Sequence, residues 1–291
     1  MTSLIARSIS RSVTTGPLAD EEIDWRVLAV FERACNLVTT GGDVVALVLP
    51  ETGDGPFNIV VERLDQSLRL IQSGMTATLR DTQLQIGELE IRLDQAVVWE
   101  PRPDWEQLRQ NREQIESRLP LAQHLTQREA PADSLLALTA PPQSPSLLRD
   151  RGEVRSLPCK QSVAGEGWGG GQLVQLAGLG GGLTPAGDDF LMGVMLRAWL
   201  AHPEPEPFCQ KLADLAAPRT TTLSAAMLRA AARGECSAAW HDLLAALEES
   251  SDELVIAAVH DVLAHGHTSG ADTLAGFLWL PTPGSPDRQL C

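Results

Sequence analysis

Residues 76–93, with the sequence TATLRDTQLQIGELEIRL, carry the pattern that decides the fold of the first third of this chain. Apolar and polar side chains alternate in the runs 76–79, 83–86 and 88–93, and Gly87 separates the last two. A period of two places alternate side chains on opposite faces of a strand, and glycine favours a turn. We therefore predict three short β-strands in this stretch.

The same pattern extends outward from Gly42 to Trp99. Further apolar runs occupy residues 44–49 and 58–61, and turn-forming residues stand at 41–42, 53–56 and 73–74. We predict a small antiparallel sheet or barrel of five or six strands in this region, within a β-rich domain at residues 1–103. An ordinary N-terminus or a first strand is expected at residues 1–19, without cleavage.

The pattern changes to a helical period after Pro101 and Pro103. Leu108, Ile115 and Leu119 form the apolar side of a predicted helix from Asp104 to about Gln127. Prolines at 131, 141, 142 and 145 follow. We therefore assign residues 104–150 to this helix and a Pro-rich linker, and we place the domain boundary in the Pro-rich stretch.

The last 110 residues are helical in pattern and belong to a third predicted region, 151–291. A capping-box spacing joins Ser250 to Glu253 before one apolar run. The predicted fold class is therefore α+β, with the strands first and the helices second. The predicted helices are 188–201, 207–217, 223–233, 237–248, 252–264 and 270–280.

The composition excludes several classes of protein. The chain has 23 basic and 38 acidic residues, a net charge of −15, which disfavours binding to nucleic acid or to an anionic membrane surface. Residues 190–201 form an apolar run that Arg197 interrupts, too short for a membrane span. The five cysteines form no C-x-x-C pair, which favours reduced thiols in a cytoplasmic protein.

Residues 178–189, GLGGGLTPAGDD, contain the densest candidate chemistry and directly precede a predicted helix. Glycines allow a backbone to approach a ligand with its N–H groups turned inward, and a helix N-terminus adds partial positive charge. No Lys-Ser/Thr pair follows, so this is not a Walker A loop, and the spacing differs from the dinucleotide fingerprint. We predict that Gly180, Gly181, Gly182 and Thr184 bind an anion.

A second loop, residues 266–272 (GHTSGAD), repeats this spacing. With Ala186 as one inserted residue, Gly182, Thr184, Gly187, Asp189 and Gly193 pair in order with Gly266, Thr268, Gly270, Asp272 and Gly276. Two loop-to-helix entries of one design suggest a single shared site, to which Thr268 and Ser269 would contribute.

Asp188, Asp189 and Asp272 have two interpretations. A carboxylate in the first turn of a helix stabilises that helix by about 1 kcal/mol as a cap. However, only one of two adjacent aspartates can be the cap. The spare carboxylate of Asp188 or Asp189 is then a candidate ligand for Mg²⁺, and all three aspartates are candidates for proton transfer.

Other candidates stand alone in the sequence. His267 could carry a proton or be a structural loop histidine. Arg219, beside three threonines, could clamp a phosphate or carboxylate, although the hydroxyl residues could simply cap the next helix. Lys160 and Trp168 lie in a glycine-rich region, and structural roles are favoured for both.

The motifs at 180–193 and 266–272, with the early segment 30–37 (VFERACNL), resemble the AllH-type subunit family of oxamate carbamoyltransferase, formerly a family of unknown function. The resemblance runs from about Trp25 to about Leu280. It implies phosphorolysis of oxalurate to oxamate and carbamoyl phosphate in purine catabolism, with two further protein subunits. It also adds Arg33 and Asn36, from the β-rich domain, as candidate contributors to anion binding.

Three hypotheses stay open at this stage. The chain is a catalytic or substrate-binding subunit of a carbamoyltransferase, or a noncatalytic scaffold subunit. Alternatively, it is a stand-alone Mg²⁺-dependent enzyme for a phosphorylated or carboxylated small metabolite. No organic cofactor is indicated by the sequence.

Overall fold

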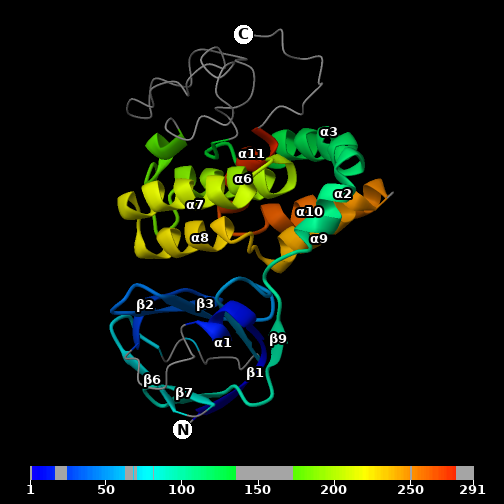
Figure 1. Cartoon of the computed structure of the whole chain (residues 1–291). Coiled ribbons are helices and arrows are strands. Elements are labelled where there is room, and N and C mark those ends of the chain that lie inside the picture. Colours follow the sequence, from blue (N-terminus) through cyan, green and yellow to red (C-terminus); the bar gives the residue numbers. More distant parts are fainter. Residues whose placement is uncertain are drawn as a thin grey trace. The chain divides into compact units, whose positions relative to one another are not determined.

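The computed structural model describes residues 2–16, 25–62, 68, 71–80, 82–135, 173–249 and 251–279. Contacts divide the chain into two compact units, which are described separately (Figure 1). The β unit comprises Met1–Asp104 and Glu235–Asp242, and the helical unit comprises Trp105–Gly234 and Leu243–Cys291. The fold class is α+β, as predicted. The Pro-rich stretch at 141–145, Lys160 and Trp168 lie outside the described residues.

The β unit is an eight-stranded barrel with one extra strand. The strand order is β5-β4-β3-β2-β6-β7-β8-β1-β9, and an additional β5–β1 pairing closes the barrel. The predicted region from Gly42 to Trp99 supplies six strands, and three more precede it. The strands are β1 (Thr2–Ser10), β2 (Trp25–Val30), β3 (Ala34–Thr39), β4 (Val44–Val48), β5 (Asn58–Val61), β6 (Thr76–Arg80), β7 (Gln83–Ile86), β8 (Leu89–Arg92) and β9 (Val97–Trp99).

Strand β1 closes the barrel because its two halves pair with different neighbours. Its first half, Thr2 to Ile5, pairs in parallel with β8, and the register shifts between Ala6 and Ser8 where it pairs antiparallel with β5. Strand β4 also pairs in parallel with β5, and β9 with β1. The barrel is therefore mixed, whereas the sequence predicted an antiparallel arrangement. Its core includes Leu4, Val27, Leu37, Leu47, Ile59, Leu84 and Ile91, all buried.

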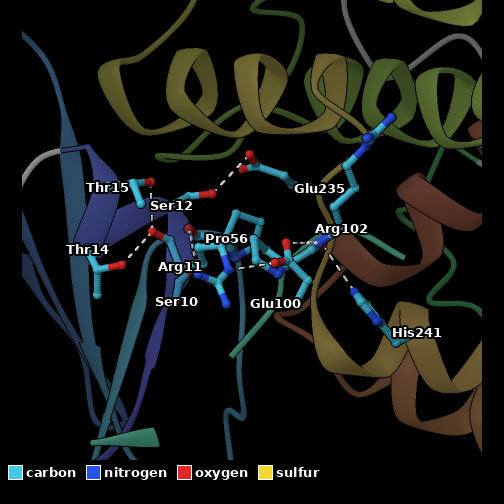
Figure 2. A network of polar contacts seen from close by, with 11 residues as sticks. Ser10, Arg11, Ser12, Thr14, Thr15, Pro56, Glu100, Arg102, Glu235 and His241 are labelled. Atoms are coloured by element: carbon cyan, nitrogen blue, oxygen red, sulfur yellow. Dashed lines mark hydrogen bonds and ion pairs between the residues drawn. The ribbon is translucent and has the colours of Figure 1, made fainter. Parts of the chain in front are cut away.

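The segment Glu235–Asp242 joins the β unit through hydrogen bonds (Figure 2). Ser12 Oγ, on the short helix α1 (Arg11–Thr15), donates to Glu235 Oε1 over 3.0 Å. His241 Nε2 lies 3.1 Å from the carbonyl oxygen of Pro101, and the Cys236 N–H donates to that same carbonyl. These bonds attach a segment distant in sequence to the end of the strand region.

Six of the predicted helices are confirmed to within a few residues, but the helix predicted from Asp104 to about Gln127 is two helices that are interrupted at Asn111. One correction concerns the cap of α10, which is Ser251 rather than Ser250: the Ser251 hydroxyl accepts from the N–H of Leu254. No helix in the described ranges is long and apolar enough to cross a membrane. The elements are α2 (Trp105–Gln110), α3 (Arg112–Glu129), η3 (Val174–Leu176), α6 (Ala186–Ala201), α7 (Pro205–Ala216), η4 (Ala217–Arg219), α8 (Thr222–Ala232), α9 (Ala238–Glu248), which begins in the β unit, α10 (Asp252–Leu263) and α11 (Ser269–Trp279).

Candidate functional site

Helices α6 and α11 lie side by side in the helical unit (Figure 1) and touch through their backbones. A Cβ atom built on Gly193 would lie 1.9 Å from the carbonyl oxygen of Thr273, and one built on Gly276 would lie 1.9 Å from that of Phe190. Each carbonyl belongs to the residue three positions before the other glycine. The contact is therefore reciprocal, and it relates the two helices by an approximate two-fold symmetry.

The first turns of these helices lie equally close to the preceding elements: α6 contacts η3, and α11 contacts α10. A Cβ atom on Gly187 would lie 2.0 Å from the carbonyl oxygen of Leu176, and one on Gly270 would lie 1.9 Å from that of Val262. Glycine is required at these positions because no side chain fits. The paired spacing seen in the sequence thus corresponds to equivalent positions in the structure.

The two loops meet at their hydroxyl groups. Thr184 Oγ1, from the first loop, lies 3.2 Å from Ser269 Oγ, at the start of α11. The Ser269 side chain also hydrogen-bonds Asp189. The structure therefore brings Thr184, Ser269 and Asp189 together at one end of the two helices.

The first loop is fastened to the segment before α8. Asp188 Oδ1 accepts from the N–H of Gly178 at 2.9 Å, and Asp188 Oδ2 accepts from the Thr220 hydroxyl. The Thr221 hydroxyl, which caps α8, also donates to the carbonyl oxygen of Leu183 at 2.5 Å. Asp188 thus uses both oxygens to position the loop, and the N-cap of α6 is Pro185, without a side-chain bond.

Asp189 has a different environment from its neighbour. Its side chain is buried, and Oδ2 has no hydrogen-bond partner in the described part of the chain. Burial raises the pKa of Asp189 to about 8, against a hydrogen bond from Ser269 that lowers it, and the charges of Asp272 and Asp188 raise it further. At pH 7 most of this carboxyl group is therefore protonated.

Asp272 occupies the equivalent place on α11 and is completely buried. Its Oδ1 accepts from the Leu135 N–H at 2.5 Å, and burial raises its pKa although this bond and one from Thr268 lower it. Asp272 Oδ2 has no partner among the residues that the structure describes. Leu135 follows α3 and lies far from Asp272 in the sequence, so no local pattern indicated this contact.

The glycine-rich loop that precedes α6 offers backbone N–H donors, in addition to those of the first turn of the helix. The N–H groups of Gly187 and Asp188 donate to the carbonyl oxygens of Leu179 and Pro185. Gly180, Gly181 and Gly182 are exposed, and in the described ranges their N–H groups have no hydrogen-bond partner. Positive φ angles at Gly180 and Gly182, 121° and 84°, suit glycine.

The remaining candidates are distributed over the surface and the β unit. His267 is exposed, with Nε2 3.1 Å from Asp133 Oδ2. Arg219 is exposed in η4, and its carbonyl oxygen contacts the loop at Gly178. Arg33, exposed before β3, and Asn36, buried in β3, belong to the β unit.

The described residues contain no group of three or more histidine, cysteine, aspartate or glutamate side chains arranged to hold a metal ion. Asp188 already has a donor on each oxygen, whereas Asp189 Oδ2 has no donor within the described residues. Magnesium binding at Asp188 and Asp189 stays a prediction.

Comparison with known families identifies both parts of the chain. The model of the oxamate carbamoyltransferase subunit AllH matches residues 176–280, which include both glycine-rich loops. The model of the AllH family N-terminal domain matches residues 5–98, the barrel. No solved structure matches the chain. Together the two family models cover most of its length, and the chain belongs to the AllH family of oxamate carbamoyltransferase subunits.

Proposed function

We propose that this chain supplies a substrate-binding site of an oxamate carbamoyltransferase, which converts oxalurate and phosphate to oxamate and carbamoyl phosphate. The observation that carries the proposal is the meeting of the two loops, where Thr184 Oγ1 and Ser269 Oγ are 3.2 Å apart at the N-terminal ends of α6 and α11. Further subunits complete the enzyme, as the family description as a subunit suggests.

The chemistry of the loops suits the anions of this reaction. Exposed N–H groups at Gly180, Gly181 and Gly182 can donate to phosphate or carboxylate oxygens, and the adjacent helix N-terminus adds partial positive charge. A chain with a net charge of −15 needs such a local site to attract an anion. Because burial raises the pKa of Asp189 to about 8, that carboxyl group is mostly uncharged at pH 7 and does not repel the ligand.

The hydroxyl groups give a direct test in the enzyme reconstituted with its partner subunits. Thr184→Val and Ser269→Ala remove one hydroxyl group each with little change in shape. We expect the rate of oxalurate phosphorolysis to fall about tenfold or more, as for the loss of one hydrogen bond to a charged group. The matched control is Ser117→Ala, which removes an exposed hydroxyl on α3 and should leave the rate unchanged.

The outcomes separate the three hypotheses. Unchanged phosphorolysis in both loop variants would favour a scaffold role, because a site that contacts substrate must respond to them. Phosphate-dependent turnover by the chain alone, lost on removal of Mg²⁺, would favour a stand-alone metal-dependent enzyme.

A further inference from the structure

Two carboxyl oxygens of the helical unit, Asp189 Oδ2 and Asp272 Oδ2, are buried without a hydrogen-bond partner in the part of the chain that the structure describes. Asp189 is 3% exposed and Asp272 is 0% exposed. A buried polar group without a hydrogen-bond partner lowers the stability of the folded state. Such a group in a native protein calls for an explanation, and a functional role is one of them. The binding of anions by the loop uses neither oxygen.

The two oxygens occupy equivalent positions. Asp189 is the fourth residue of α6 and Asp272 is the fourth residue of α11. Each lies four residues before the glycine at which the helices touch, Gly193 or Gly276, and that contact is reciprocal. The charge of Asp272 also raises the pKa of Asp189, so the two carboxyl groups lie within electrostatic range of each other.

In each aspartate, hydrogen bonds engage the carboxyl group without occupying Oδ2. Ser269 hydrogen-bonds Asp189, and the N–H of Leu135 donates to Asp272 Oδ1. The Oδ2 atom remains available as an acceptor, and it can be the carbonyl oxygen when the group is protonated. The residue before Leu135 adds an independent observation: Ser134 Oγ, from a different segment, is also buried without a partner in the described ranges.

We propose that Asp189 and Asp272 together recognise the terminal –NH₂ of a carbamoyl group, each Oδ2 accepting one of its two N–H hydrogens. This inference rests on the proposed function and assigns the residues that select the transferred group. An –NH₂ presents two donors, and the structure presents two unpaired acceptors in equivalent positions. The loop N–H groups provide donors for the oxygens of the same ligand, so donors and acceptors are complementary.

The pairing gives a basis for selectivity. An acetyl group has nearly the size of a carbamoyl group but carries a methyl group in place of –NH₂. Binding it would leave both Oδ2 atoms unpaired, and sites built to bond a substrate N–H reject analogues that lack it. The two aspartates therefore select carbamoyl over acyl compounds.

Two stable phosphonates test this selectivity by calorimetry on the full chain: phosphonoacetamide, which ends in –CO–NH₂, and acetonylphosphonate, which ends in –CO–CH₃. We expect wild type to bind the amide at least about tenfold more tightly, the effect of one retained hydrogen bond. Asp189→Leu and Asp272→Leu keep the branched shape and remove the acceptors. Their preference for the amide should fall toward equal affinity, with acetonylphosphonate affinity changed only a few fold.

Thr273→Val is the matched control, because it removes a buried polar group of α11 whose hydroxyl already donates to the carbonyl oxygen of Ser269. It should keep the wild-type preference. Equal affinity of wild type for the two phosphonates overturns the inference, whether or not the leucine variants fold, and so does an undiminished preference in both folded leucine variants. Binding of neither phosphonate by wild type overturns the proposed function itself.

Discussion

At the scale of single residues, the adjacent aspartates of α6 have different tasks because different neighbours surround them. Asp188 has a donor on each oxygen, from Gly178 and Thr220, and so holds the glycine-rich loop in place. Asp189 is buried with one oxygen that has no partner among the described residues, and burial raises its pKa to about 8. The helix therefore carries one carboxyl group that stabilises the loop and one that is retained at a cost in stability.

This difference predicts a pH-dependent gain in stability for Asp189→Asn. The pKa of Asp189 is higher in the folded state than in the unfolded state, so the unfolding free energy falls as the pH rises from about 4 to about 8. Asparagine does not ionise, so the unfolding free energy of the variant does not fall in this way as the pH rises. We expect the variant to exceed wild type in stability by about 1 kcal/mol or more at pH 8, with little difference at pH 4.

Denaturant unfolding at several pH values measures this effect. Asp188→Asn is the matched comparison, since it disturbs two existing bonds and should lower stability by about 1 kcal/mol. A loss of stability in Asp189→Asn that is independent of pH would contradict the assignment of the raised pKa to this carboxyl group.

At the scale of elements, the crossing of α6 and α11 sets the geometry of the site. Glycine stands at both contact points because carbonyl oxygens of the opposite helix occupy the space of a Cβ atom. Close backbone contact holds the helix entries in a fixed relation, which places Thr184 beside Ser269. The contact between these two hydroxyl groups therefore depends on glycine packing about two helical turns away.

Gly193→Ala tests this dependence. The added methyl group would meet the Thr273 carbonyl at 1.9 Å, so the helices must separate, and we expect stability to fall by about 3 kcal/mol or more. Gly181→Ala is the control, because no atom of the described residues lies within 4 Å of a Cβ atom there and its φ is not positive. Equal thermal stability of the two variants would show that the helices do not need this contact.

At the scale of the whole chain, the two family models correspond largely to the two structural units. One segment is an exception, because its contacts group it with the β unit whereas its sequence lies within the AllH match. Glu235–Asp242 groups with the β unit but lies within residues 176–280, which the AllH model matches. His241 contributes to this attachment, with Nε2 3.1 Å from the Pro101 carbonyl and its ring centroid 5.0 Å from that of Trp99.

The attachment should weaken in acid. Burial lowers the pKa of His241, against a hydrogen bond to Pro101 that raises it, so the unfolded state binds the proton more tightly. The stability contributed by neutral His241 is therefore complete above about pH 6.5 and is lost as the pH falls below that value. In wild type, we expect acid to increase the local opening of residues 235–242, measured as a loss of hydrogen-exchange protection of their amides. In His241→Gln this acid-dependent loss of protection should be absent at 235–242, while other segments keep the pH dependence that they have in wild type. An identical pH dependence in both proteins would exclude His241 as the cause.

The sequence by itself determined the elements and the repeated loops of this protein, because both depend on local spacing. Alternation with a period of two and short apolar runs located the five strands from β4 to β8 but not β9, and apolar faces located the helices. The repeat of glycine, threonine and aspartate indicated two equivalent helix entries, and the glycine spacing already contained the crossing points Gly193 and Gly276.

Only the tertiary structure decided which of these residues meet and what their environments do to them. Barrel closure by β1 depends on partners distant in the chain, as do the bond from Leu135 to Asp272 and the return of Glu235–Asp242 to the β unit. The sequence could not distinguish Asp188 from Asp189, because hydrogen bonding and the pKa depend on burial and on neighbours from other helices. Local pattern fixes secondary structure, whereas the charge state and the partners of a carboxyl group arise from packing.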